Sequence, residues 1–147
     1  DKLYGLCGEI NLSGTSENDA LLFKHPTGTG KIVYISKLIA GLISTVSAQL
    51  KVRVYKSPTI TSNGTAMTIS PARIGGSPPS SIVTAYSLPT ISARGTLLRT
   101  YVGSDVATIF DEIASRIILE PNNNILVTGQ SSSTNKPLGI TLSWVEL

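Results

Sequence analysis

Residues 55–65 read YKSPTITSNGT, and 31 residues later residues 86–96 read YSLPTISARGT. In both copies a proline stands three residues after the tyrosine, and a glycine stands six residues after the proline. Each copy follows a short run of β-branched and apolar residues, which favour strands, and glycine is a residue that turns favour. The repeat therefore predicts one β-turn-β unit used twice, as in sandwiches and barrels of short strands.

Runs of β-branched and apolar residues bounded by glycine, proline and asparagine continue along the whole chain. Leu138, Ile140, Leu142 and Trp144 alternate with small or polar residues and so share one face of a strand, with the tryptophan expected in the core. Segment 105–115 fits either a short helix or a strand, because short apolar runs are ambiguous. The other runs predict strands near residues 3–12, 20–24, 31–43, 48–55, 66–70, 82–86, 97–102, 115–120, 125–129 and 138–145.

This spacing predicts an all-β fold, an antiparallel β-sandwich of jelly-roll type with about 8–10 strands. The length of 147 residues is that of one ordinary domain, so residues 1–147 are expected to form a single domain. Residues 1–12 are the candidate for a strand that pairs with, or is exchanged between, neighbouring copies.

Charged residues make up 14% of the chain, and its net charge is +3. Soluble domains average about 25% charged residues, so this composition favours a structural protein whose faces are covered by neighbours. Lysine and arginine are scattered rather than clustered, which argues against nucleic acid as a partner. No apolar run reaches the roughly 20 residues of a membrane-spanning helix, so no membrane partner is expected.

The segment HPTGTGK at residues 25–31 is superficially similar to a phosphate-binding loop. It fails because that loop needs a glycine where His25 stands and a serine or threonine where Ile32 stands. His25 is the only histidine, so a zinc site is not expected, and we expect an exposed histidine in a turn. The glycines are expected to serve turn geometry alone, at Gly28, Gly30, Gly64 and Gly95.

Acidic residues suggest no catalytic site. Asp111 and Glu112 are the only adjacent pair, and on a strand they would point to opposite faces. Glu17 and Asp19 offer oxygens to a calcium ion, but their spacing does not match an EF-hand loop. We therefore predict no catalytic, cofactor-binding or metal-binding residue and expect a protein that is not an enzyme.

Interface residues are expected near the first strand and in one loop. Segment 71–81 holds three prolines and two glycines, which exclude a central strand, and is either a plain connector or a surface arm that touches a neighbour. Cys7 is the only cysteine and is expected to be a small buried residue; a reactive thiol and an intersubunit disulfide are the alternatives. The interface candidates are Tyr4, Cys7, Ile74, Pro78 and Pro79.

Three stretches carry a resemblance to known proteins: LLFKHPTGTGKIVYI at residues 21–35, the two Pro-Thr-Ile…Gly-Thr phrases, and ILEPNNNILVTGQ at residues 118–130. They resemble small β-rich virion surface proteins of tailed bacteriophages. Such proteins serve as capsid decoration, fibre or other surface components, often as trimers. The resemblance implies an extracellular, virion-surface location for this chain.

The function expected from the sequence is that of a capsid decoration (cement) subunit. It would stabilise the particle through contacts with its own copies, preferably as a trimer, and with the major capsid protein or another virion protein. The first alternative is a filament subunit assembled by addition of the strand at residues 1–12. The second is a receptor- or carbohydrate-binding fibre head that uses Tyr55 and Tyr86, which end strands before turns.

Overall fold

The computed structural model describes residues 2–43, 47–77, 79–103, 109–111 and 117–147. The described residues form β-strands and no helix, and every strand pair is antiparallel. The predicted all-β fold is therefore confirmed. No helix in the described residues is long and apolar enough to cross a membrane.

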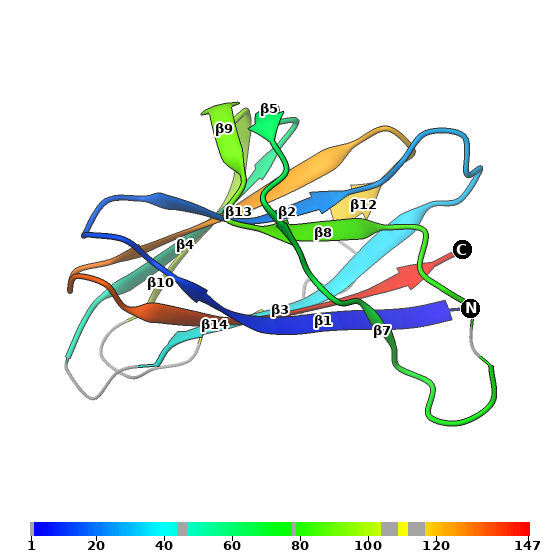
Figure 1. Cartoon of the computed structure of the whole chain (residues 1–147), viewed down its shortest axis with the longest axis horizontal. Helices are drawn as coiled ribbons and strands as arrows, with labels where there is room; N and C mark the ends of the chain where they lie inside the picture. The colour runs from blue at the N-terminus through cyan, green and yellow to red at the C-terminus, as the bar shows by residue number, and fades with distance from the viewer. Residues whose placement is uncertain (1, 44–46, 78, 104–108, 112–116) are drawn as a thin grey trace.

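Two sheets lie face to face in a sandwich-like arrangement (Figure 1). The first sheet has the order β11 (Ile109–Asp111), β3 (Val33–Leu42), β14 (Pro137–Glu146), β1 (Lys2–Asn11) and β7 (Ser70–Pro71), with β12 (Ile117–Leu119) also pairing with β3. The second sheet has the order β10 (Thr96–Gly103), β4 (Leu50–Lys56), β13 (Asn124–Ser131), β2 (Asn18–Lys24), β8 (Thr84–Ser87) and β6 (Thr65–Ala66).

The long strand pairs are nested along the chain. The first strand pairs with the last, β1 with β14, and inside this pair β2 pairs with β13. Further inside, β3 pairs with β12 and β11, and β4 pairs with β10. The chain is thus a long antiparallel ribbon that is folded over into two sheets.

The core lies between the two sheets and follows the alternation expected of half-buried strands. Along β14 every second residue is buried, with Trp144 at the centre as predicted. Its ring stacks on Tyr4 at a centroid distance of 6.1 Å and meets the edge of Phe23 at 4.8 Å. Aromatic pairs at these distances add to the stabilisation from burial alone.

The two copies of the repeated phrase pair with each other. Each copy supplies one strand of a two-stranded sheet, β5 (Thr59–Ser62) with β9 (Thr90–Ala93), in which Ile60 lies opposite its counterpart Ile91. Figure 1 shows this ribbon on the outer side of the second sheet. The strands that flank this ribbon pair in equivalent registers. In β6 and β8 Thr65 lies opposite Ser87, and in β10 and β4 the corresponding Thr96 lies opposite Lys56. The copies are therefore related by an approximate twofold axis.

Each copy of the repeat presses its glycine against the backbone of the other. A Cβ atom on Gly64 would overlap the carbonyl oxygen of Ser87, and one on Gly95 would overlap that of Lys56. Both glycines also have positive φ, 89° and 85°, as do Gly28 and Gly30. The conformation and the close approach together require glycine at these two positions.

The structure corrects the strand predicted at residues 66–70. The chain leaves the second sheet after β6 and joins the first sheet at β7, because this segment crosses one edge of the sandwich instead of following one sheet. The sequence also missed β5 and β9, which have partners only in each other. In segment 105–115, residues Ile109–Asp111 are a strand, and the rest lies outside the described residues.

Candidate interaction surface

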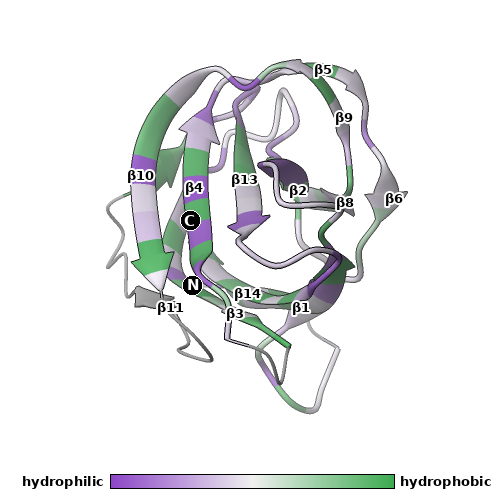
Figure 2. Ribbon diagram, turned by 90° about the vertical axis from the view of Figure 1, so that its left-hand side faces the viewer, coloured by the Kyte–Doolittle hydropathy of each residue, from purple (hydrophilic) through white to green (hydrophobic). Residues whose placement is uncertain are grey.

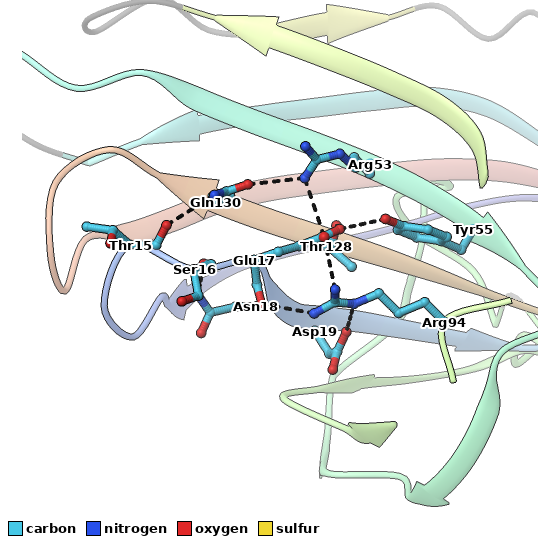
Figure 3. A network of polar contacts seen from close by, with 10 residues as sticks. All are labelled: Thr15, Ser16, Glu17, Asn18, Asp19, Arg53, Tyr55, Arg94, Thr128 and Gln130. Carbon is cyan, nitrogen blue, oxygen red and sulfur yellow. Dashed lines mark hydrogen bonds and ion pairs between the residues drawn. The ribbon is translucent and has the colours of Figure 1, made fainter. Parts of the chain in front are cut away.

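A polar network centred on Glu17 covers part of the outer face of the second sheet (Figure 3). One carboxylate oxygen of Glu17 accepts hydrogen bonds from the hydroxyls of Tyr55 (2.7 Å) and Thr128 (2.6 Å). The other oxygen lies 2.9 Å from Nη1 of Arg94 and 3.5 Å from Nη1 of Arg53. Every oxygen of this carboxylate therefore has a partner.

The same network removes the calcium site considered for Glu17 and Asp19. Nε of Arg94 donates to Oδ1 of Asp19 at 2.7 Å, and its Nη2 donates to the carbonyl oxygen of Glu17 at 2.9 Å. The guanidinium thus occupies the oxygens that a cation would need. No group of three acidic, histidine or cysteine side chains that could hold a metal occurs in the part of the chain that the structure describes.

Burial alone would raise the pKa of Glu17, but the environment lowers it. Hydrogen bonds from Thr128 and Tyr55 and the charges of Arg94 and Arg53 favour the ionised form and hold the pKa below the usual range of a glutamate. Burial and the neighbouring carboxylate in turn raise the pKa of Tyr55. The hydroxyl of Tyr55 therefore stays protonated and donates its hydrogen bond to Glu17.

Replacing Glu17 with glutamine is expected to destabilise the fold at neutral pH by about 1–3 kcal/mol, since a partly buried charged acceptor with four donors is lost. The folded-state pKa lies below the unfolded one, so this stabilisation is present at neutral pH and is lost as the pH falls through the folded-state pKa. The free energy of unfolding in urea, followed by the fluorescence of Trp144, the only tryptophan, measures both effects.

The wild type and Glu17→Gln should therefore converge in stability as the pH falls below about 4. The matched control is Glu120→Gln, since Glu120 is exposed and its carboxylate has no hydrogen bond in the described structure. A stability gap between wild type and Glu17→Gln that stays constant through the acidic range would contradict the role given to the carboxylate.

The loop predicted as a connector or an arm projects beyond the first sheet. Figures 1 and 2 show it extending past β1, away from the second sheet. We call residues 72–80 the arm; Pro78 lies outside the described residues. At its tip Ile74 is 100% exposed, and Gly75 and Gly76 have positive φ.

Both ends of the arm are fixed to β1. At its start the N–H of Ala72 donates to the carbonyl oxygen of Leu3 at 2.9 Å. Near its end the hydroxyl of Tyr4 lies within hydrogen-bond distance of the carbonyl oxygens of Pro79 (3.1 Å) and Ser80 (3.3 Å). Burial and the negative charge of Glu146 raise the pKa of Tyr4, so its hydroxyl stays protonated and can donate.

Glu146 holds the chain just after the arm. Its side chain is only 2% exposed, yet no cation lies within ion-pair distance of it in the described residues. One oxygen accepts hydrogen bonds from the Ser81 hydroxyl (2.5 Å), the Ile82 N–H (3.1 Å) and the Trp144 indole N–H (3.3 Å). These donors stabilise Oε1 and hold residues 81–82 against the core, whereas the buried Oε2 has no hydrogen-bond partner in the described structure.

The outer face of the first sheet beside the arm is almost free of charge. A row of apolar side chains crosses it in register, where Leu3 and Ile118 are 49% and 56% exposed. Among the described outward-facing residues of β1, β3, β12 and β14, only Glu9 and Lys37 are charged. We call this surface the uncharged face; its apolar row is Leu3, Val145, Tyr34 and Ile118.

The opposite outer face has a different character. Along β4 the inward valines alternate with outward Lys51, Arg53 and Tyr55, and Figure 2 shows the hydrophilic bands this produces. That face also carries the network of Glu17. The two outer faces therefore differ in charge, although both carry exposed apolar side chains, such as Ile118 on the first sheet and Val102 on the second.

The predicted interface residues differ in their exposure. Ile74 and Pro79 are exposed on the arm, whereas Tyr4 is a core residue that anchors it. The prediction of a buried Cys7 is wrong: the thiol is exposed on β1, because it falls on the outward-facing register of the strand. Cys7 lines a groove of about 510 Å³ between β1 and residues 68–72. Sequence reasoning missed Glu146, whose place near the chain end carried no motif.

The exposed turn histidine is also a wrong prediction. His25 is only 1% exposed, and its Nε2 lies 2.9 Å from the carbonyl oxygen of Lys31, to which it must donate. Its backbone bonds Asn122 and Asn123, so two loops close over the ring. His25 therefore stabilises the turn that follows it.

No protein-family model matches the chain, and no curated protein matches it either.

Proposed function

We propose that this protein is a non-enzymatic structural subunit of a virion surface, a decoration subunit that binds its own copies and a virion protein. The observation that carries the proposal is the uncharged face with the anchored arm at its edge. A face with exposed leucine and isoleucine and two charges is costly to leave in water, and burying it between subunits removes that cost.

The nested strand pairs support the finer assignment of a jelly roll. In that fold a long antiparallel ribbon is wound into two packed sheets, and it is common in viral capsid proteins. Pairing of β1 with β14, β2 with β13, β3 with β12 and β4 with β10 follows this scheme. The fold alone does not specify function, so the proposal depends on the uncharged face.

The two alternatives have less support in the contacts. Strand exchange would have to remove β1, which pairs with β14 over its whole length and contributes Tyr4, Leu6 and Ile10 to the core. A carbohydrate site at Tyr55 could use the ring face only, because the hydroxyl is bonded to Glu17. The proposal therefore keeps β1 within its own chain and places the partner on the uncharged face.

The test is the native mass of the purified protein by light scattering across a concentration series. We expect a closed oligomer, with a trimer favoured, whose mass is a multiple of 15.5 kDa. Ile118→Lys places a charge in the apolar row and is expected to shift the protein to monomer. The control Val102→Lys changes a similarly exposed residue on the other sheet and should leave the mass unchanged.

A wild-type protein that stays monomeric throughout the series would contradict the proposal, as would an oligomer that Ile118→Lys leaves intact. The virion location has its own test. Immunogold electron microscopy of particles from the source of the sequence should label their outer surface, and particles without label would contradict that location.

A further inference from the structure

The arm presents a small, preorganised binding element. Its two ends are fixed by Leu3 and Tyr4 on β1 and its continuation by Glu146, so the ends do not have to be ordered again when the segment between them binds. The tip itself consists of Arg73 and Ile74, followed by two glycines. An exposed apolar side chain next to a cation fits an apolar groove that has an acidic side chain beside it.

The groove beside Cys7 has matching chemistry. None of the residues that line its 510 Å³ is charged, and its walls include Leu3, Cys7 and Thr141 of the outer sheet face. This space exceeds the volume of one isoleucine side chain. The arm of the same chain does not fill it, because Ile74 is entirely exposed.

The charges next to the tip and next to the groove are opposite. Arg73 is exposed and has no ion pair or hydrogen bond in the described structure, and the same holds for Glu9 on the outer face of β1. Glu9 stands two residues beyond Cys7 on the same face, which is about 7 Å along a strand. An arginine beside an isoleucine seated at Cys7 can span that distance.

We infer that the arm of one copy binds the groove of a second copy, with Ile74 in the groove and Arg73 against Glu9. This inference rests on the proposed function and names the contact by which its subunits hold each other. Arm and groove are adjacent on each subunit, so the contact can be made reciprocally in a dimer or head to tail in a ring.

The single native cysteine makes a direct test possible. Ile74→Cys introduces a thiol at the arm tip, and mild oxidation should join it to Cys7 of a neighbouring copy. A disulfide forms only when the two Cα atoms come within about 7 Å of each other. On a non-reducing gel we expect covalent dimers, trimers or a ladder, and the largest species reports whether the contact closes on itself.

Two control proteins define the result. Val102→Cys carries an exposed thiol on β10 and should crosslink at least about tenfold less, since β10 belongs to the second sheet and lies in neither element of the inferred contact. Ile74→Cys combined with Cys7→Ser should not crosslink. If this double variant crosslinks as well as the single one, the arms meet each other and the inference is overturned.

The native mass separates this inference from the proposed function. An oligomeric protein in which Ile74→Cys crosslinks no better than Val102→Cys overturns the arm-to-groove contact alone. A protein that is monomeric at every concentration overturns both.

Charge reversal gives an independent test without oxidation. Arg73→Glu and Glu9→Arg should each weaken self-association by about three- to tenfold, because each places like charges together. The double variant should restore it, since the pair is then formed with its signs exchanged. Single variants that associate as the wild type does, or a double variant no better than either single one, would overturn the pairing of Arg73 with Glu9.

Discussion

Gly95→Ala is expected to cost about 3–5 kcal/mol of unfolding free energy, a large fraction of the stability of a domain of this size. The new methyl group would overlap the carbonyl oxygen of Lys56, and φ at this position is 85°. That carbonyl belongs to a strand end that also pairs with β10 and β13, so the backbone cannot move away without breaking these pairs.

Gly28→Ala is the matched control for this prediction. Gly28 has a similar φ of 75°, but no atom lies within 4 Å of the position of its Cβ. Gly28→Ala should therefore lower the unfolding free energy only by the cost of a positive φ for alanine, about 1–2 kcal/mol. Urea unfolding followed by Trp144 fluorescence measures both variants. Equal losses would mean that the close approach of the two repeats contributes nothing to stability.

Trp144→Ala is expected to destabilise the protein by about 3–5 kcal/mol, as for other truncations of large buried aromatic residues. The indole is fully buried, stacks on Tyr4, meets Phe23 in an edge contact, and donates to Glu146. Its removal leaves a cavity and also takes one donor from a buried carboxylate. Circular dichroism during thermal and urea unfolding is the appropriate measurement, because the variant lacks the only tryptophan.

Trp144→Phe separates the two contributions. The ring that fills the core is largely kept, but the hydrogen bond to Glu146 is lost, so the expected cost is about 1–3 kcal/mol. A phenylalanine variant as unstable as the alanine variant would show that the hydrogen bond, and not the packing, dominates at this position.

The parts of the fold that could be predicted are those set by the pattern of residues adjacent in sequence. The alternation of residues 138–145 defined β14 and its buried face, because burial and strand period are both properties of neighbouring residues. Pairing partners are not local. The sequence displayed the repeat but not the pairing of β5 with β9, which depends on the approach of two segments about 30 residues apart.

The same limit applies to the candidate surface. The composition of the arm was visible in its prolines and glycines, and Ile74 stood out as an apolar residue in a polar loop. The face to which Cys7 points depends on strand register, and one residue of shift reverses it. His25 is buried by the loop at residues 122–123, about 100 residues away in sequence, which no local pattern indicates. Glu146 continues the inward alternation of β14, but its donors Ser81 and Ile82 are distant in sequence.

The arm lies in the stretch that joins the two copies of the repeat. The two copies of the repeat pair with each other, and the chain at the ends of the arm is bonded to the first and last strands. The fold therefore does not depend on the residues between the two ends of the arm. The arm is therefore an exchangeable module on a constant scaffold. Its length and chemistry can change while the sandwich beneath keeps its shape.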